Sequence, residues 1–494
     1  MEHSLIPVPV SVEAAVGTWF PLTPATRVLA PPGHARVGEL LAAALRAATG
    51  YPLPVADAGD PGGGAIRLRL AEDAALGEEG YQLEVAEASV TLRARTPAGL
   101  FRGAQTVRQL LPTAPPWRLP GGRVGDRPRF AWRGVALDVA RHFFTVEEVE
   151  RYLDLLALYK LNVLHLHLTD DQGWRIAVDG WPRLATVGGA TQVGGGPGGC
   201  YTREDWSRIV GYARDRHVTV VPEVDVPGHS NAALAAYAEL NCDGRAREPY
   251  TGTGVGFSCL DVEAPATWRF LDEVLGELAD RTPGPWLHVG GDEVELLGVE
   301  RYAAFVQRVV RLVARHGKQA VGWQETAAAD DPPPVLQLWK PGAAPAAARR
   351  AARRGSRLLL SPADRVYLDM KYGPATRLGL DWAGHVEVRD AYQWEPSALE
   401  GSGEPGTGAP EDRDGVDEGA VLGVEAALWS ETLRDLGDAE EMTLPRLPGI
   451  AEVAWSPAGT RDWDGYRRRL AAHGPRWSAM GLRWHRSRQV PWPA

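Results

Sequence analysis

The chain has 494 residues, which is too long for one small core and fits a barrel-sized domain with a smaller companion. Its composition, 44% hydrophobic and 23% charged, excludes a disordered or fibrous protein. The formal net charge of -10, with the acids spread along the chain, argues against a nucleic-acid partner, because phosphate binding needs clustered Lys and Arg.

No apolar run is long enough to cross a bilayer, so no membrane partner is expected. The first residues, MEHSLIPVPVSVE, have neither a basic n-region nor an apolar h-region. No signal peptide is therefore visible, which fits either a cytoplasmic protein or an exported one whose signal has been removed.

The chain has three cysteines, Cys200, Cys242 and Cys259, which excludes a disulfide scaffold and a cysteine-rich zinc protein. Cys242 and Cys259 could close a loop of about 18 residues, worth roughly 3 kcal/mol in an oxidising compartment. Reduced thiols are an equally good interpretation.

The first part of the chain predicts a small α+β domain over residues 1–125. A Pro/Gly/Arg-rich stretch, PPWRLPGGRVGDRPRF, follows and predicts a linker, because Pro and Gly disrupt helices and strand pairing. The catalytic domain is then expected over residues 126–494. Within the first domain, strands are predicted at 65–70, 81–85 and 90–95, and helices at 35–48 and 98–111.

After residue 134 the sequence changes to short apolar runs separated by helical patterns, which is typical of parallel strands buried on both faces. The helix expected at 146–160 begins with Thr145 and Glu148 as a capping box. Eight strands with helical crossovers favour an α/β (β/α)₈ TIM barrel. The predicted strands are 134–140, 163–169, 219–225, 286–292, 320–325, 335–339, 357–361 and 422–429, with further helices near 203–216, 265–281, 299–316 and 343–354.

Active sites of such barrels lie at the carboxyl ends of the strands, and polar or aromatic residues follow each run. Carboxylates and Arg bind hydroxyl pairs, and indole faces cover the apolar face of a pyranose. A carbohydrate is therefore the expected substrate. In strand order these residues are Arg141; Asp170 and Asp171; Asp225 and His229; Asp292 and Glu293; Trp323 and Glu325; Trp339; Tyr367 and Asp369; and Trp429 and Glu431.

The segment HVGGDE, ending in Asp292 and Glu293, is the sharpest motif. Two glycines before a carboxylate pair allow close approach of backbone and ligand. Like charges so close resist double ionisation, so the less solvated carboxyl is expected to stay protonated and donate a proton while the other stays ionised.

Motifs along the whole barrel resemble those of glycoside hydrolase family 20, the β-N-acetylhexosaminidases. The N-terminal segment, from IPVPVSV to GLFRGAQTVRQLL, is similar to the small domain that precedes the barrel in that family. The matching barrel segments are GVALDVARHFF, LNVLHLHLTDDQGWRI, VTVVPEVDVPGHS, WLHVGGDEV, VGWQE, VYLDMKY and AALWSE.

The resemblance implies a retaining exo-hydrolase that removes terminal N-acetylglucosamine or N-acetylgalactosamine from oligosaccharides without a metal or cofactor. Glu293 would protonate the glycosidic oxygen and later activate water. Asp292 would orient the acetamido N–H, and Tyr367 would bind the acetamido oxygen as it attacks the anomeric carbon, a substrate-assisted exception among glycosidases. A monomer or homodimer is expected.

Further residues are implied as substrate-binding positions. Trp323, Trp339 and Trp429 would form a cage around the acetamido methyl. Arg141 and Glu431 would hold the ring hydroxyls, with Asp369 close by and Trp382 as a wall of the aglycone side. Asp170 and His229 would support the acid. The Gly/Pro/acid-rich segment 401–419 matches no usable motif.

Two alternatives remain open. His165 and His167 share one face of a strand, a pairing that metal-dependent barrel hydrolases also use, although a hydrogen-bonded pair is favoured. A non-catalytic sugar-binding relative is the second alternative. Such a relative would be expected to lack the acid or its orienting partner, and both Asp292 and Glu293 are present.

Overall fold

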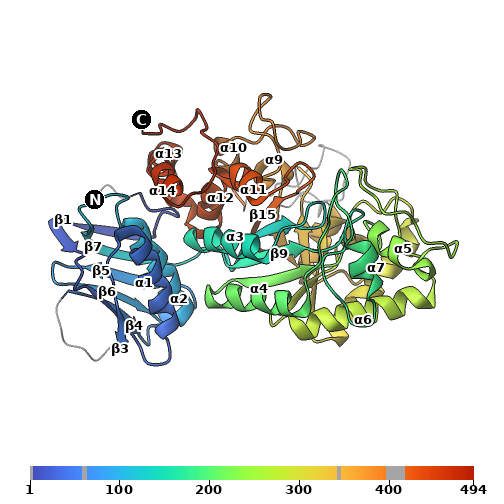
Figure 1. The fold of residues 1–494 in the computed structure, drawn as a ribbon, viewed down its shortest axis with the longest axis horizontal. Coiled ribbons are helices and arrows are strands. Elements are labelled where there is room, and N and C mark those ends of the chain that lie inside the picture. The colour runs from blue at the N-terminus through green and yellow to red at the C-terminus, as the bar shows by residue number, and fades with distance from the viewer. Residues whose placement is uncertain (1–3, 58–63, 342–345, 397–417, 494) are drawn as a thin grey trace.

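The computed structural model describes residues 4–57, 64–341, 346–396 and 418–493. A seven-stranded sheet with two helices forms one end of the molecule, and a closed eight-stranded barrel forms the other (Figure 1). The predicted (β/α)₈ barrel preceded by a small α+β domain is confirmed.

The N-terminal sheet is mixed, with strand order β1-β7-β5-β6-β4-β2-β3. α1 (Ala35–Thr49) and α2 (Pro97–Leu110) cover the face turned toward the barrel (Figure 1). Thr96 starts α2 by accepting a hydrogen bond from the backbone N–H of Gly99. The strands are β1 (Ser11–Pro21), β2 (Arg27–Ala30), β3 (Val55–Asp57), β4 (Ala65–Leu70), β5 (Tyr81–Val85), β6 (Ser89–Ala94) and β7 (Arg118–Asp126).

β7 shows that the prediction of a linker over PPWRLPGGRVGDRPRF was wrong. This strand lies between β1 and β5. Pro120 pairs with Trp19 of β1 and lies beyond the β5 pairing, which runs from Gly122 to Asp126. Proline has no backbone N–H to donate, and at this position β5 requires no donor from β7. The Pro and Gly content of the segment therefore does not exclude a strand.

The barrel closes in the order β10-β11-β12-β13-β14-β15-β8-β9, and all its pairings are parallel. Each predicted run overlaps one strand, because a strand covered on both faces leaves an apolar run in the sequence. The strands are β8 (Trp132–Asp138), β9 (Val163–His167), β10 (Thr219–Glu223), β11 (Trp286–His288), β12 (Gln319–Trp323), β13 (Val335–Leu338), β14 (Arg357–Leu360) and β15 (Val421–Leu428).

Helices follow the barrel strands along the chain, and the last of them, α11 to α14, come after β15. The predicted capping box is present at the start of α3, where the side chains of Thr145 and Glu148 bond each other's backbone N–H groups. The helices are α3 (Val146–Leu158), α4 (Arg203–Asp215), α5 (Asn231–Ala236), α6 (Pro265–Arg281), α7 (Val299–Arg315), α8 (Ala346–Arg353), α9 (Ala363–Val366), α10 (Val388–Tyr392), α11 (Leu436–Thr443), α12 (Arg446–Trp455), α13 (Trp463–Ala471) and α14 (His473–Ala479).

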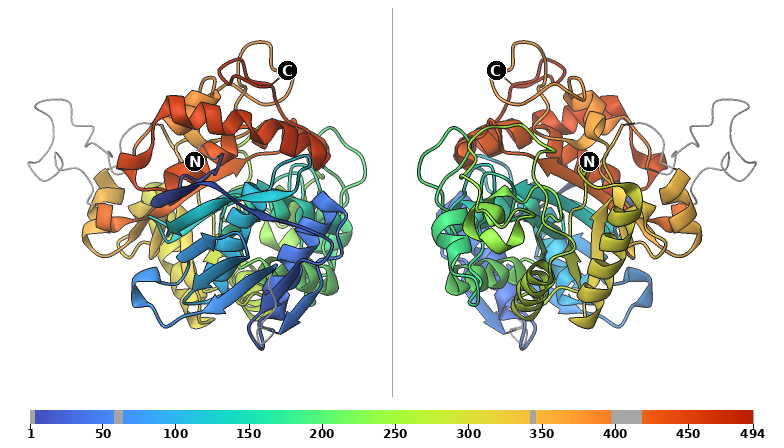
Figure 2. Two further views of the ribbon diagram at one scale, coloured as in Figure 1. Left: turned by 90° about the vertical axis from the view of Figure 1, so that its left-hand side faces the viewer. Right: turned by 90° about the vertical axis from the view of Figure 1, so that its right-hand side faces the viewer.

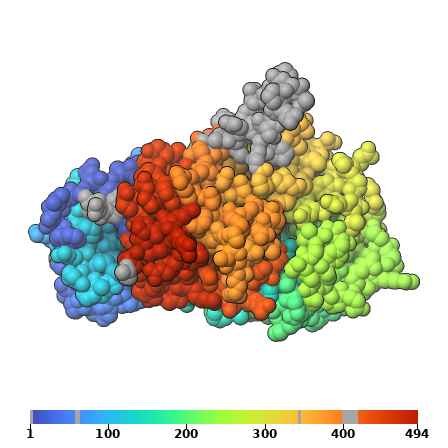
Figure 3. Space-filling view, turned by 90° about the horizontal axis from the view of Figure 1, so that it is seen from above, coloured from blue at the N-terminus to red at the C-terminus, as the bar shows by residue number. Residues whose placement is uncertain are grey.

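The C-terminal helices join the two domains. Figure 2 shows them above both the N-terminal sheet and the barrel, and Figure 3 shows the red C-terminal residues beside the blue N-terminal ones. Arg476 of α14 donates to the carbonyls of Arg108 (3.0 Å) and Leu111 (2.7 Å). Lys160, after α3, forms a buried ion pair with Asp126 of β7 at 2.8 Å. These contacts hold the sheet rigidly against the barrel.

Cys200, Cys242 and Cys259 are free thiols. Among the described residues, no helix combines the length and the apolar character needed to span a bilayer. Of the segment 401–419, for which the sequence predicted no role, residues 401–417 lie outside the described residues.

Candidate active site

A cavity of about 280 Å³ lies at the carboxyl ends of the barrel strands. All but two of the predicted site residues line it. The exceptions, Asp170 and Trp323, are buried behind its wall. The sequence did not identify Thr253, Val255 and Leu380, which come from loops and carry no distinctive signal. The lining residues are Arg141, His229, Thr253, Val255, Asp292, Glu293, Trp339, Tyr367, Asp369, Leu380, Trp382, Trp429 and Glu431.

The backbone after β11 explains the two glycines of the motif. Gly290 has φ +62°, and a Cβ there would lie 1.8 Å from Oδ1 of Asp225. Glu293 (φ +52°) and His229 (φ +48°) also adopt the left-handed conformation, which non-glycine residues rarely do. Such strain persists where the surrounding structure enforces it, and it aims both side chains at the cavity.

A line of charged groups leads to Glu293. Arg141 Nη2 lies 2.8 Å from Asp170 Oδ2, and the other oxygen of Asp170 lies 3.2 Å from His229 Nδ1. His229 Nε2 lies 3.5 Å from Glu293 Oε2. Burial opposes the charge on His229, but Asp170 keeps its pKa well above the usual range. The adjacent His229 in turn lowers the pKa of Glu293.

Asp292 faces a second aspartate, Asp225, which follows β10. Asp225 Oδ1 accepts a hydrogen bond from the backbone N–H of Gly291 at 2.8 Å. Burial and the nearby Asp292 raise the pKa of Asp225 well above its usual range. Burial also raises the pKa of Asp292 to about 6, with His229 opposing and Glu325 adding to the shift. A protonated Asp225 can donate a hydrogen bond to ionised Asp292, which lowers the pKa of Asp292 in turn. The sequence placed Asp225 at a strand end but did not include it among the site residues.

The electrostatics of the pair correct one expectation. The sequence assigned the proton to the less solvated carboxyl and, through the family resemblance, to Glu293. The less solvated carboxyl is Asp292, whereas the side chain of Glu293 is 34% exposed and has the lowered pKa. Asp292 turns inward to Asp225, while Glu293 keeps contact with solvent and His229. A ligand must therefore displace water from Glu293 before its pKa can rise.

Two carboxylates of the cavity have buried oxygens without a protein partner. Among the described residues, both oxygens of Asp369 and Oε2 of Glu431 accept no hydrogen bond. Burial, together with Glu431, raises the pKa of Asp369 well above its usual range, and burial raises that of Glu431. Unpaired buried carboxylates are costly, and adjacent hydroxyl donors of a sugar would satisfy both.

Aromatic rings form the rest of the chamber. The Trp429 ring centroid lies 5.9 Å from that of Trp323 and 6.1 Å from that of Tyr367. The Trp382 ring meets Tyr367 and Trp339 edge to face, at 5.9 Å and 5.8 Å. Trp382 is 52% exposed, whereas Trp323 is buried. The chamber therefore has a closed apolar floor beside the carboxylates and an indole at its open side.

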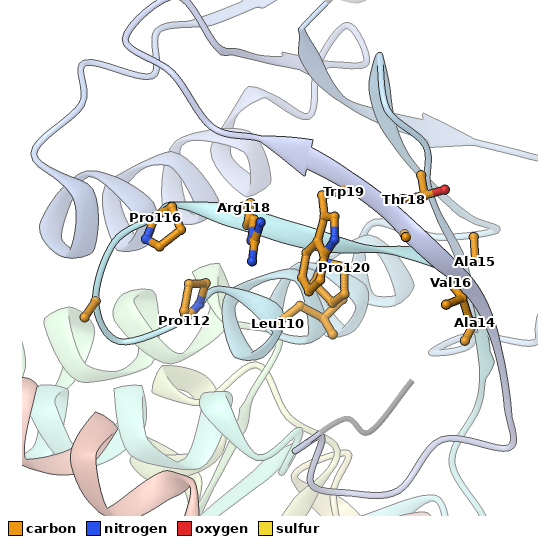
Figure 4. Close-up of a pocket in the computed structure, with 13 residues that line it drawn as sticks. Ala14, Ala15, Val16, Thr18, Trp19, Leu110, Pro112, Pro116, Arg118 and Pro120 are labelled. Atoms are coloured by element: carbon orange, nitrogen blue, oxygen red, sulfur yellow. The ribbon is translucent and has the colours of Figure 1, made fainter.

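A groove in the N-terminal domain has different chemistry. It measures about 530 Å³ and lies beside Trp19, Leu110 and Pro120 (Figure 4). The Arg118 guanidinium lies 4.2 Å from the Trp19 ring centroid. Arg118 is the single charged residue among those that line the groove. Without paired titratable groups this groove offers no acid–base chemistry.

His165 and His167 are bound by carboxylates. His165 Nδ1 lies 2.9 Å from Glu425, and its Nε2 lies 3.0 Å from Glu223. His167 Nδ1 contacts Glu223, and its Nε2 lies 2.8 Å from Asp170. All four ring nitrogens thus have a carboxylate neighbour, and three of them, His165 Nδ1 and both nitrogens of His167, form hydrogen bonds to it, as the sequence favoured.

Paired carboxylates at the strand ends of a barrel, a cationic support for one of them and an indole-lined chamber define a glycoside hydrolase. Comparison with known proteins gives the family. The model of the glycosyl hydrolase family 20 catalytic domain matches residues 130–301 and 296–458, and that of family 20 domain 2 matches residues 2–127. The chain belongs to glycoside hydrolase family 20.

Relatives of known activity match over the full length. A β-N-acetylhexosaminidase of Cellulomonas fimi is 46% identical, with 99% of this chain and 97% of that protein covered. The structure of the family 20 β-N-acetylhexosaminidase of Streptomyces coelicolor A3(2) is 51% identical, with a TM-score of 0.93 and coverage of 100% and 99%. A mutant Streptomyces plicatus β-hexosaminidase in complex with the product GlcNAc is 50% identical, with a TM-score of 0.93 and coverage of 100% and 98%.

Proposed function

We propose that the chain is a retaining exo-β-N-acetylhexosaminidase that removes a terminal non-reducing N-acetylglucosamine or N-acetylgalactosamine from oligosaccharides. The observation that supports this most directly is the position of Asp292 beside a closed aromatic chamber. A carboxylate at that place can bind an acetamido N–H whose methyl group lies against the indoles. A sugar without the acetamido group would cover Asp292 without offering it an N–H donor.

In this proposal the acetamido oxygen is the nucleophile. Asp292 accepts a hydrogen bond from the acetamido N–H and stabilises the positive charge that develops on the nitrogen. Tyr367 donates its hydroxyl hydrogen bond to the acetamido oxygen as the C1–O bond forms and the glycosidic bond breaks. The tethered group acts at high effective molarity, so no enzyme nucleophile is needed. Water then opens the oxazolinium ring at C1, and the configuration is retained.

Glu293 supplies and recovers the proton. It protonates the departing glycosidic oxygen and then removes a proton from the attacking water. Asp170 and His229 orient it. The incoming sugar displaces water from Glu293, which raises its pKa toward the value that an acid needs.

The remaining residues select the sugar. Trp323, Trp339 and Trp429 enclose the acetamido methyl. Arg141, Asp369 and Glu431 bind ring hydroxyls, which confines the terminal sugar and favours exo action. Trp382 stacks on the aglycone side. We also propose residues 1–125 as the companion domain, residues 126–494 as the catalytic domain, and a monomer or homodimer as the active form.

Hydrolysis of p-nitrophenyl β-N-acetylglucosaminide and of the matching non-acetylated β-glucoside tests this function. We expect cleavage of the acetylated substrate and, because one nucleophile is missing, at least about 10³-fold lower kcat/KM for the glucoside. The β-galactosaminide measures the C4 preference in the same assay. Equal cleavage of the acetylated and non-acetylated glycosides would show that the enzyme carries its own nucleophile.

The pH profile is a second expected result. Asp292 must be ionised to stabilise the acetamido nitrogen, and its pKa is raised to about 6 in the free enzyme. kcat/KM reports free-enzyme groups, so it should fall as pH drops through about 6. The Glu325 charge helps to raise that pKa, so Glu325→Gln should move the acidic limb to lower pH. An unmoved limb in the variant would assign it to another group.

A further inference from the structure

Glu223, the last residue of β10, is fully buried and contacts two parts of the site at once. Its Oε1 accepts a hydrogen bond from Nε1 of Trp323 at 3.0 Å. Its Oε2 contacts Nδ1 of His167, whose Nε2 lies 2.8 Å from Asp170. Trp323 lies behind the chamber wall with its ring 5.9 Å from that of Trp429, which lines the chamber, and Asp170 contacts His229 beside the acid. One carboxylate therefore touches both the chamber and the acid support.

Charges alternate along this second line. Burial opposes ionisation of Glu223, but His288, His167 and His165 keep its pKa well below the usual range. Burial also opposes a charge on His167, yet Glu223 and Asp170 keep its pKa well above the usual range. A buried carboxylate is thus held as an anion beside the cationic rings of His165 and His167 and the neutral N–H donor of Trp323. Such a group fixes the orientation of its partners more firmly than a neutral acceptor would.

We propose that Glu223 is a positioning residue that couples the two halves of the reaction. Through Trp323 it sets the fit of the acetamido group, and through His167 and Asp170 it sets the orientation of the His229–Glu293 pair. The inference rests on the proposed function, since both effects are defined for an N-acetylated glycoside.

Glu223→Gln tests the coupling with little change in volume. Oε1 accepts from Trp323 and also lies 2.8 Å from His288 Nδ1. Oε2 contacts His167 and lies 3.0 Å from His165 Nε2. The glutamine has one acceptor oxygen and one NH₂ group in place of the two oxygens. The glutamine can keep the Trp323 hydrogen bond only with its NH₂ group toward His167, which must then lose its Nδ1 proton in order to accept, and the reverse orientation sets the NH₂ group against the Trp323 N–H. Either orientation removes the negative charge and alters one of the two contacts. Misplacing a reacting group by about 1 Å costs about 10²-fold in rate, which is the expected loss of kcat/KM.

The chain offers a matched control in Glu425 of β15. This glutamate is also fully buried and also contacts His165. Its other partners are Gln337 at 2.9 Å and Trp132 at 2.7 Å, neither of which lines the cavity. Glu425→Gln therefore carries the same chemical change and a similar risk to folding, without the two contacts that matter.

The experiment measures two ratios for wild type, Glu223→Gln and Glu425→Gln, each checked for folding by circular dichroism and thermal unfolding. The first is kcat/KM for a 2,4-dinitrophenyl relative to a methyl β-N-acetylglucosaminide, which reports dependence on the acid. The second is kcat/KM for N-acetyl relative to N-butanoyl p-nitrophenyl glucosaminide, which reports the acetamido fit. We expect Glu223→Gln to raise the first ratio and lower the second, each by about tenfold, and Glu425→Gln to leave both at the wild-type value.

Single-contact variants separate the two routes and remain informative if Glu223→Gln fails to fold. Trp323→Phe should change only the acyl ratio, and His167→Gln should change the leaving-group ratio more than the acyl ratio. A uniform loss on all substrates, or the same changes in Glu425→Gln, would overturn the inference and assign Glu223 to stability alone. Wild-type enzyme that failed to cleave the acetylated substrate would instead count against the proposed function.

Discussion

Asp292→Asn is expected to lower kcat for p-nitrophenyl β-N-acetylglucosaminide by about 10²- to 10³-fold, with a much smaller change in KM. Asparagine keeps the size of the side chain but removes the charge that stabilises the acetamido nitrogen as it becomes positive. Removing one preorganised electrostatic group of this kind costs about that factor in kcat. The loss should fall on kcat because the charge develops only in the transition state.

The structure adds a reason to expect a large effect. Asp292 is partly buried, and its neighbour Asp225 has a pKa well above the usual range, because burial and Asp292 both disfavour the charge of Asp225. Protonated Asp225 can donate to a carboxylate at position 292. The asparagine amide has one oxygen, which accepts, and one NH₂ group, which does not. When the NH₂ group faces Asp225, the hydrogen bond from Asp225 is lost. The variant is therefore expected to lose orientation as well as charge.

A matched control is available in Asp364→Asn. Asp364 lies in α9, three residues before Tyr367, and its side chain is 30% exposed beside Arg365. The same chemical change there should leave kcat within about twofold, because surface substitutions of this kind are nearly neutral. Steady-state kinetics on both variants checks the expectation. An Asp292→Asn enzyme with wild-type kcat would remove Asp292 from the mechanism.

Glu293→Gln is expected to produce a loss that depends on the leaving group. For a methyl or sugar aglycone, kcat/KM should fall by about 10²- to 10⁴-fold, the usual contribution of a general acid. For a 2,4-dinitrophenyl aglycone, which departs without protonation, the fall in kcat/KM should be far smaller. The first irreversible step governs kcat/KM, so this quantity isolates the departure of the aglycone from the later attack of water.

The same variant tests the role of Glu293 in the second step. Attack of water needs a base, so kcat for the dinitrophenyl substrate should fall even where kcat/KM does not. Azide, which needs no deprotonation, should restore turnover and give a β-glycosyl azide, identified by NMR. A loss of equal size for all leaving groups, with no azide product, would mean that Glu293 is not the acid.

The architecture could be predicted from local sequence patterns. Strands such as β9 and β15 are covered on both faces, so each leaves an apolar run whose end marks the carboxyl edge of the barrel. Helix starts are equally local, as at Thr145, where the capping box is a four-residue pattern. Residues after the runs, including Asp292 and Tyr367, were therefore assigned to one end of the barrel without any contact information.

Amino-acid composition predicted secondary structure less well where pairing with other strands determined it. Residues 118–126 contain Pro and Gly in the proportion of a loop, yet they form β7 because β1 and β5 supply partners on both sides. Nothing in the segment itself records those partners. The loop residues Thr253 and Val255 were missed for the same reason, since their place in the cavity depends on how a loop folds back.

The sequence by itself determined the barrel, the carboxylate pair at a strand end and, through the family motifs, the kind of sugar to expect. Only the tertiary structure decided the charges. Which carboxyl of the pair is less solvated, that Asp292 helps to raise the pKa of Asp225, and that Glu223 contacts both Trp323 and His167 depend on side chains brought together from different strands. Periodicity is a local property of the chain, whereas burial and electrostatic coupling arise from packing between segments far apart in sequence.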